Sequence, residues 1–258
     1  MKLNFKWIGA GCFTLEVNDQ LKLACDPCLG PKGSLYDFKF FKSSRIKDPV
    51  YEPSDFKDVD CWLLTHQHED HIDNKGTKYL MTDVKKIAQR DMSKWLAKEG
   101  VKNVDTVAWG EDRKIVKNDI TINVQAVPAI HGSNMLSSFF AGKVNGYWLT
   151  ITSGEECKTV YITGDTVCNK KTEQFLGNRV CDVLVPNMGE VLKDRFGGPL
   201  TLNDEMLDHM IDCLEPLAVL PIHFGCFSHY SSKFPNVNIY HKALVQKTEP
   251  GKSLELTI

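Results

Sequence analysis

Apolar and polar residues alternate, or apolar residues run together in short blocks, over the N-terminal part of the chain. The stretches 3–8, 12–17 and 21–25 show this pattern, and glycines and the pair Asn18-Asp19 separate them. Short apolar-rich runs bounded by turn residues favour β-strands. We therefore expect three consecutive strands joined by tight turns.

Similar patterns continue along the chain and predict further strands at 59–64, 104–108, 114–116, 120–127, 147–152, 159–163, 183–186 and 218–221. Helix signals are fewer. A short helix is expected from Asn74, a second over 91–98 with Asp91 as N-cap, and a third over 203–214 capped by Thr201 or Asn203. A β-rich first half followed by interleaved strands and helices favours a sheet-on-sheet core with helices outside.

One long segment, residues 29–58, has no regular pattern. It is rich in Gly, Pro, Lys and Ser, and it also contains the aromatic residues Tyr36, Phe38, Phe40, Phe41, Tyr51 and Phe56. Loops of this length inside a compact domain are usually functional or disordered, and aromatic residues argue against disorder. We expect either a substrate-covering loop, with Lys32, Lys39, Lys42 or Arg45 as an anion contact, or a flap that merely covers the core.

Composition fits a single globular domain spanning residues 1–258. The chain is 42% hydrophobic and 25% charged, with a formal net charge of −2. We therefore expect neither a nucleic-acid partner nor membrane association, because the net charge is not positive and no long apolar run is present. The nine cysteines are odd in number and several lie in strand-like runs, which favours reduced thiols in the cytoplasm. Assembly into a homo-oligomer is left open.

Potential metal ligands are most concentrated in His66-Gln67-His68-Glu69-Asp70-His71, directly after the apolar run 61–65. Residues i and i+2 of an extended backbone point to the same side, so His66 and His68 can bind one ion. Asp70 and His71 follow where the chain turns and can face a second position. Imidazole and carboxylate together suit zinc or manganese, with iron as an alternative.

Three more potential ligands each follow an apolar, strand-like run. His131 follows 124–130, Asp165 follows 160–164 and His223 follows 218–222. A single histidine after a strand is more often structural, and Gly-Asp is often only a turn. The same arrangement occurs four times here, however, which gives seven candidate metal ligands: His66, His68, Asp70, His71, His131, Asp165 and His223.

These motifs together resemble the metallo-β-lactamase-fold hydrolase superfamily. The matching elements are Asp26-Pro27, Thr65 to His71, His131, Gly164-Asp165-Thr166 and Pro221-Ile222-His223-Phe224, in the family's order. The resemblance implies an α/β (α+β) fold, a four-layer αββα sandwich, and two divalent metal ions. It assigns His66, His68 and His131 to one metal, assigns Asp70, His71 and His223 to the other, and makes Asp165 the bridge.

Within the superfamily the chain looks nearest to the ascorbate-6-phosphate lactonase-like branch. Trp7-Ile8-Gly9, Asp26-Pro27 and the stretch Gly197-Gly198-Pro199-Leu200-Thr201-Leu202 carry this resemblance. Phospholipase-D-like members share much of the same layout. The true zinc β-lactamases commonly have a cysteine in place of the bridging aspartate, so antibiotic hydrolysis is not expected.

Two adjacent cations lower the pKa of a water between them, and the bridging hydroxide is the expected nucleophile. Asp70 is expected to orient it, as a catalytic residue. The leaving group still needs a proton, and His229 is the candidate donor, with His209 as a second one. Tyr230 and Thr201 are the candidate substrate-binding residues.

The favoured function is therefore hydrolysis of a small ester, lactone or phosphorylated metabolite, a small-molecule substrate in each case. A phosphodiesterase, nuclease or phospholipase-D-like hydrolase is one alternative, although no basic insertion for gripping RNA is present. A thioester hydrolase is another, but its expected Gly-His-Thr is replaced by Ile130-His131-Gly132. A non-catalytic metal-binding protein would usually have lost ligands, and here the set is complete.

Overall fold

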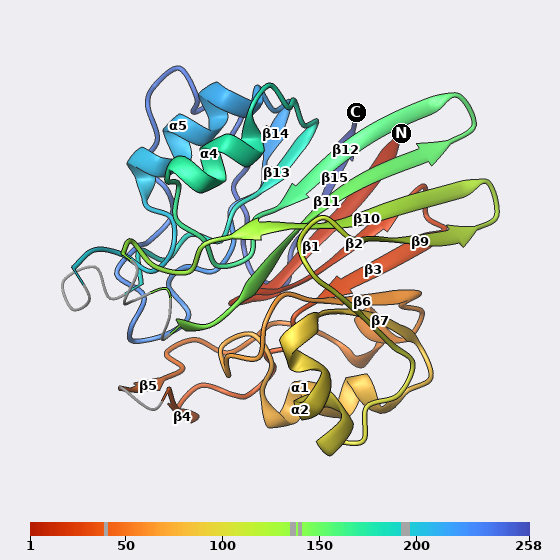
Figure 1. Ribbon diagram of the computed structural model, residues 1–258, viewed down its shortest axis with the longest axis vertical. Coiled ribbons are helices and arrows are strands. Elements are labelled where there is room, and N and C mark those ends of the chain that lie inside the picture. Colours follow the sequence, from red (N-terminus) through yellow and green to blue (C-terminus); the bar gives the residue numbers. More distant parts are fainter. Residues whose placement is uncertain (39–40, 135–137, 139–140, 192–196) are drawn as a thin grey trace.

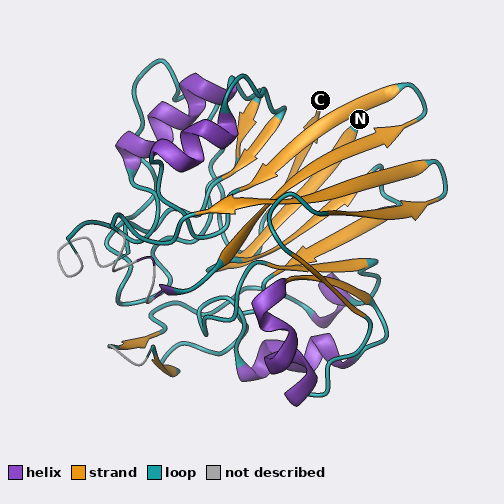
Figure 2. Cartoon of the chain, viewed as in Figure 1, coloured by secondary structure: helices purple, strands orange, loops and turns teal. Residues whose placement is uncertain are grey.

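Two β-sheets pack face to face, and helices cover the outer face of each sheet (Figure 1). The computed structural model describes residues 1–38, 41–134, 138, 141–191 and 197–258. Helices α1 and α2 lie on one outer side, and α4 and α5 lie on the other, as the colouring by secondary structure makes plain (Figure 2). The expected four-layer αββα architecture is confirmed.

The first sheet has seven strands in the order β15-β1-β2-β3-β6-β7-β8. The first three strands in sequence form an antiparallel meander, whereas β3, β6, β7 and β8 run parallel. The strand bounds are Lys2–Gly9 (β1), Cys12–Val17 (β2), Leu21–Cys25 (β3), Cys61–Leu64 (β6), Lys85–Gln89 (β7), Val104–Val107 (β8) and Ser253–Thr257 (β15).

The second sheet has six strands in the order β14-β13-β12-β11-β10-β9. Strands β9 to β12 are antiparallel, and β12, β13 and β14 are parallel. The strand bounds are Asp112–Lys117 (β9), Ile120–Ala129 (β10), Val144–Ser153 (β11), Glu156–Ile162 (β12), Val183–Val185 (β13) and Ala218–Val219 (β14). A separate hairpin pairs Leu35–Asp37 (β4) with Lys42–Ser44 (β5).

The helices are short, and polar residues cap several of them. Asp73 accepts a hydrogen bond from Gly76 N at the start of α1, and Asn203 does the same for Met206 N at the start of α5. The helix bounds are Asn74–Thr77 (α1), Ser93–Lys98 (α2), Lys170–Leu176 (α4) and Asp204–Leu214 (α5), with 3-10 turns at Pro53–Phe56, Lys78–Met81 and Arg90–Met92.

Three buried apolar layers correspond to the three interfaces of the sandwich. The largest lies between the sheets and includes Phe5, Leu63 and Ile122. A second packs α1 and α2 against the first sheet, and a third packs α4 and α5 against the second. In β10 the even-numbered residues from Ile120 to Ala126 are buried. Because side chains alternate along a strand, these residues place one face of β10 in the central layer.

Most expected elements are present, with differences at their ends. Asp91 is not the N-cap of the second helix: it lies inside a 3-10 turn, and α2 begins after Met92. Asn203, rather than Thr201, caps α5. Helix α4, strands β7 and β15 and the hairpin β4–β5 were not expected, although Asn169 and Thr172 form a capping box that predicts α4.

The topology brings distant parts of the sequence to one edge of the sandwich. Strands β6, β12 and β13 end there, and the long strand β10 delivers its C-terminal end to the same region (Figure 1). In sheets with parallel strands, the loops at the carboxyl ends gather polar side chains at such an edge. No described helix has the length and hydrophobicity needed to cross a membrane.

One ion-pair cluster on α5 gives a test of how the outer helix is held. His241 Nδ1 lies 2.5 Å from Asp208 Oδ1, and His241 Nε2 lies 3.0 Å from Asp212 Oδ1. These carboxylates are one turn apart on α5 and repel each other. Hydrogen bonds to Asp208 and then Asp212 raise the pKa of His241, even though desolvation opposes this.

A histidine with a raised folded-state pKa stabilises fully below its unfolded pKa of about 6.5, and this contribution disappears as pH rises through the folded pKa. His241→Gln should therefore lower the free energy of unfolding by roughly 0.5–1 kcal/mol near pH 5.5, and by almost nothing near pH 9. Chemical denaturation at both pH values, at equal metal load, measures this. An equal loss at both values would show that charge is not the cause.

Candidate metal centre

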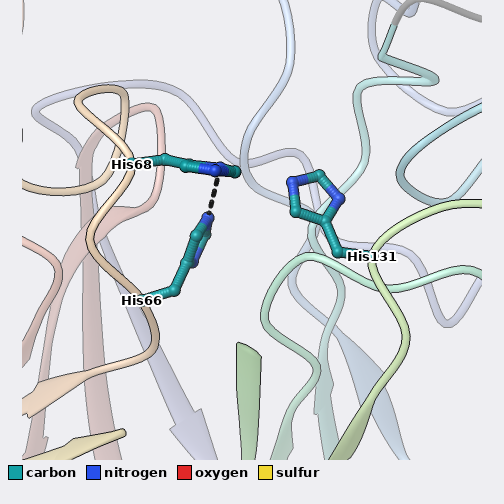
Figure 3. A group of neighbouring side chains, drawn as sticks. All are labelled: His66, His68 and His131. Carbon is teal, nitrogen blue, oxygen red and sulfur yellow. Dashed lines mark hydrogen bonds between the residues drawn. The ribbon is translucent and has the colours of Figure 1, made fainter. Parts of the chain in front are cut away.

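All seven candidate ligands meet at this edge of the sandwich. The nitrogen atoms of His66, His68 and His131 lie within 4.8 Å of one another, and Figure 3 shows the three rings converging. A second triad with the same close spacing is formed by Asp70, His71 and His223. The two triads are those that the family resemblance implied, one for each metal.

Asp165 lies between the two triads and faces both of them. Its Oδ1 is 3.1 Å from His71 Nε2 and 3.5 Å from His223 Nε2. Its Oδ2 is 3.5 Å from His131 Nε2 and 4.0 Å from His66 Nε2. One carboxylate oxygen therefore points to each triad, which is the geometry that a bridging ligand needs.

Hydrogen bonds on the outer side of the rings fix three of the imidazoles. His71 Nδ1 lies 2.6 Å from Asp26 Oδ2, and the Nδ1 atoms of His131 and His223 lie 2.9 Å and 3.1 Å from the carbonyls of Leu200 and Met188. Each acceptor selects the tautomer with a proton on Nδ1, so Nε2 presents its lone pair to the centre.

The backbone is strained where it delivers these ligands. His223 has a φ of +64°, a left-handed conformation that a residue with a β-carbon rarely adopts. Gly164, before Asp165, has a φ of +59°, and a β-carbon there would lie 2.7 Å from the carbonyl of Asn145. Such conformations persist only where the surroundings enforce them, and they cluster at functional sites.

The cluster fits divalent cations. His66 Nε2 and His68 Nδ1 face each other at 3.0 Å, as do the Nε2 atoms of His71 and His223. Asp70 Oδ1 is buried, and no described residue offers it a hydrogen bond. Burying so many polar atoms around one point is costly unless something satisfies them, and cations bound by imidazole and carboxylate do so.

The protonation states also suit metal binding. Burial lowers the pKa of His66 well below its usual range, that of His68 to about 4, and that of His131 as well. These rings are therefore neutral at pH 7, as ligands must be. His71 differs: burial opposes its charge, but the neighbouring carboxylates of Asp165 and Asp26 raise its pKa, so a cation has to displace its proton.

Both carboxylates of the centre are ionised. Burial opposes ionisation of Asp70, but the neighbouring imidazoles of His223 and His229 hold its pKa well below the usual range. The nearby charges of His223 and His71 do the same for the pKa of Asp165, again against burial. Asp165 Oδ1 also accepts a hydrogen bond from Asn187 Nδ2 at 2.9 Å, which orients it.

His229 and Tyr230 lie beside the second triad. His229 Nε2 is 3.2 Å from Asp70 Oδ2, and its Nδ1 is 2.5 Å from Ser43 Oγ. The Tyr230 hydroxyl is 3.1 Å from the same Asp70 oxygen and 2.8 Å from His223 Nε2. Both residues are therefore close enough to act on a group bound at the centre, and their catalytic and substrate-binding roles stay predictions.

The segment 29–58 divides into two parts. Its first part lies over the cluster: the Phe38 ring is 5.1 Å from the His229 ring and 6.0 Å from the His68 ring, and Phe41 stacks on Phe38 at 4.8 Å. Its second part packs away from the cluster, where Tyr51 and the ring of Phe56 meet at 5.6 Å in the outer apolar layer. One part of the segment therefore lies over the cluster and the other over the core, and the substrate-covering role of the first part stays a prediction.

Two cavities open beside the cluster. One, of about 440 Å³, is lined by Phe38, His66, His68 and Lys143 among others. The other, of about 770 Å³, is lined by His131 and, farther out, by Trp109, Lys143, Lys170 and Lys171. They share Lys143 and lie on the side of the centre that carries His66, His68 and His131.

Several sequence-based expectations for other residues need correction. Arg45 cannot serve as an anion contact, because its side chain is buried and donates to the carbonyls of Cys28 and Lys47. His209 lies on α5 beside Cys213, not at the centre, so it cannot donate a proton there. Thr201 is fully buried and accepts from Val191 N, so its substrate-binding role stays a prediction. Lys39 and Phe40 lie outside the described residues.

Two residues that support the centre were missed. Asn187 follows the strand Val183–Val185, so it repeats the arrangement of a polar residue after an apolar strand that identified Asp165 and His223. Ser43 contacts His229 from β5, and no sequence signal brings these two together, because 186 positions separate them. Asn187 was therefore predictable from the pattern, and Ser43 was not.

Comparison with known proteins shows the family of this chain. The family model for a beta-lactamase superfamily domain matches residues 22–224. A UPF0173 metal-dependent hydrolase of Pyrococcus abyssi is 31% identical over 212 residues, which cover 80% of this chain and 86% of that protein. Relatives of the lactonase branch are not among these matches, so that finer placement stays a prediction.

Two further matches concern a lipid enzyme and a solved structure. N-acyl-phosphatidylethanolamine-hydrolyzing phospholipase D 1 of Caenorhabditis elegans is 26% identical over 72% of this chain, but only 49% of that protein is covered. The crystal structure of a possible metal-dependent hydrolase from Veillonella parvula superposes with a TM-score of 0.80 at 17% identity, covering 98% of this chain and 99% of the other. At this identity the structural match shows the shared fold.

The bridging geometry predicts how metal content responds to mutation. Asp165→Ala removes the one carboxylate that faces both triads, so the variant should lose between one and two ions per chain relative to the wild type. Asn187→Ala removes only the group that orients Asp165, so it should keep its ions but bind them roughly 10–100-fold more weakly.

Elemental analysis after gel filtration and titration with a competing chelator measure both quantities. If Asp165→Ala retained the full metal content and wild-type affinity, Asp165 would not be a ligand. If Asn187→Ala lost as much metal as Asp165→Ala, the difference between bridging and orienting residues would be wrong.

Proposed function

This chain belongs to the metallo-β-lactamase superfamily and is a metal-dependent hydrolase, and we propose that it uses two divalent ions to hydrolyse a small ester, lactone or phosphorylated metabolite. The observation that carries the proposal is the position of Asp165, with one carboxylate oxygen toward each histidine-containing triad. The unpartnered Asp70 Oδ1 in the second triad supports it.

In this proposal His66, His68 and His131 hold one ion, Asp70, His71 and His223 hold the other, and Asp165 contacts both. When bound, such ions supply Lewis acidity for the scissile carbonyl or phosphoryl group and lower the pKa of water. Zinc or manganese fits this donor set best, with iron as an alternative. The chain's own residues then position the ligands, admit the substrate and move protons.

His229 is proposed as the proton donor to the leaving group. Asp70 is ionised and can only accept, so His229 Nε2 carries a proton and donates it to Asp70 Oδ2. The donor role requires the imidazolium form, in which Nδ1 also carries a proton and donates to the Ser43 hydroxyl oxygen 2.5 Å away. Asp70 thus orients the proton donor through Oδ2, which leaves Oδ1 to face the ion of the second triad. Its further role in orienting the attacking water stays a prediction.

The surroundings support a small substrate that carries an anionic group. The rings of Phe38 and Trp109 supply apolar walls, while Lys143, Lys170 and Lys171 line the cavity beside His131. Small-molecule sites usually combine apolar walls with a few polar anchors. Lysine ammonium groups next to the metal centre favour phosphate or carboxylate in the part of the substrate that does not react.

A phosphodiester substrate is the second candidate. The relative from Caenorhabditis elegans is a phospholipase D that hydrolyses N-acyl-phosphatidylethanolamine, and its match covers 72% of this chain. Phosphodiester cleavage would use the same metal ligands and the same proton donor. A panel of lactones, carboxylic esters, phosphodiesters and thioesters, tested on the metal-analysed protein, separates the candidates. Turnover of no member of the panel above the metal-free protein would contradict the proposed substrate classes.

The roles proposed for the centre predict different kinetic losses. Asp165→Ala should abolish turnover, because it disturbs both metal sites. His229→Ala should retain its metal and lose about 10²–10⁴-fold in kcat, the usual worth of a proton donor. Steady-state kinetics with the best substrate of the panel give both values. Near-normal kcat for His229→Ala would assign the proton transfer to another group.

The divided segment 29–58 offers a matched pair of aromatic substitutions. Phe38→Ala removes a ring over the centre and should change KM or substrate preference while metal content stays intact. Tyr51→Ala removes a ring of the same segment that packs against Tyr79 in the outer layer, so it should lower stability and leave KM unchanged. Identical kinetics for the two variants would show that the first part of the segment, like the second, only covers the core and does not affect the substrate.

A further inference from the structure

A second group of potential metal ligands lies on the outer helical layer, apart from the central cluster. Cys168 precedes α4 by two residues, and Glu173 lies in the first turn of α4. His209 and Cys213 lie one turn apart on the same face of α5. The two helices lie side by side over the six-stranded sheet (Figure 1). The ligand atoms of Cys168, Glu173 and His209 form one close group, and Cys213 lies next to His209.

Two of the separations match those between the ligands of a tetrahedral ion. His209 Nε2 lies 3.4 Å from Glu173 Oε1 and 3.7 Å from Cys213 Sγ. Cys168 Sγ lies within 4.8 Å of the ligand atoms of His209 and Glu173. Zinc bonds of roughly 2.0 Å to nitrogen or oxygen and roughly 2.3 Å to sulfur place tetrahedral ligands about 3.3–3.8 Å apart. Cys213 lies next to His209 but outside the group of three atoms that are mutually within 4.8 Å, so Cys168 and Cys213 would both move closer on binding an ion.

The chemistry of the donors selects the ion. Two thiols, one imidazole and one carboxylate form a mixed set that suits zinc rather than magnesium or calcium. Burial, and then the nearby Glu173 carboxylate and Cys213 thiol, raise the pKa of Cys168 to about 11, although Thr172 opposes this. Burial and Glu173 also raise the pKa of Cys213. A bound cation would stabilise the thiolates of both Cys168 and Cys213.

Access and position are both favourable. The side chains of Glu173 and His209 are 44% and 50% exposed, so an ion can reach them from solvent. Cys168 lies three residues after Asp165, and the intervening Thr166 and Val167 pair with Ile130 through hydrogen bonds of 2.9 Å. An ion at Cys168 would therefore fix the end of the segment that carries Asp165.

We propose that Cys168, Glu173, His209 and Cys213 form a separate zinc site that ties α4 to α5 and anchors the segment following Asp165. This site differs from the central cluster in one decisive respect. The seven ligands of the central cluster are histidines and aspartates, with no thiol among them. Spectroscopy that detects only thiolate ligands therefore reports on the outer site alone.

The test is titration of the metal-stripped, reduced full-length protein with cobalt(II), a spectroscopic substitute for zinc. The wild type should develop a thiolate-to-cobalt charge-transfer band that saturates at one ion per chain. The double variant Cys168→Ser/Cys213→Ser should lose this band and bind one ion fewer. Cys157→Ser, which changes an exposed thiol on β12, should retain the band and serves as the control.

His209→Ala guards against a folding defect in the double variant, because this half-exposed side chain is not part of the core. It should shift the midpoint of the charge-transfer band to higher cobalt while α5 stays folded by circular dichroism. Absence of the band in the wild type, or its persistence in the double variant, would overturn the proposal. The proposal would also be overturned if protein purified without reductant contained a Cys168–Cys213 disulfide and the same protein, once reduced, bound no cobalt.

Discussion

The carboxylate of Asp165 is the constraint on which the rest of the centre depends. It is completely buried, and each of its oxygens faces a different pair of histidines. Neutral rings cannot stabilise such an arrangement as well as cations can, because a neutral imidazole carries one N–H, and in His71, His131 and His223 it lies on Nδ1, directed away from the centre. The two halves of the centre therefore exist as one unit, and neither triad is complete without this side chain.

The fold meets this constraint by drawing ligands from both sheets. His66 and His71 follow β6 of the first sheet, whereas His131 and Asp165 follow β10 and β12 of the second. The outer contacts of the rings come from elsewhere again: Asp26 lies at the end of β3, and the Leu200 carbonyl precedes α5. Packing of the two sheets thus sets the distances in the centre, so the apolar layer between the sheets contributes to function through its thickness.

The sequence predicted the parts of the molecule that repeat a local signal. An apolar strand followed by a potential ligand occurs at His66, His131, Asp165 and His223, and that repetition together with the family resemblance predicted the fold and the side chains that the structure brings together. Contacts between remote segments carry no such signal. Nothing local brings Ser43 to His229, divides the segment 29–58 into a part over the centre and a part over the core, or places Cys168 beside His209. These depend on how the layers pack.

The central claim is that two ions lie on opposite sides of Asp165. Anomalous diffraction from crystals of the metal-loaded protein, recorded on both sides of the absorption edge of the bound metal, tests it most directly. The account predicts two peaks, one among His66, His68 and His131 and one among Asp70, His71 and His223, with a carboxylate oxygen of Asp165 directed at each. A single peak in fully loaded crystals, or two peaks that Asp165 does not separate, would contradict it.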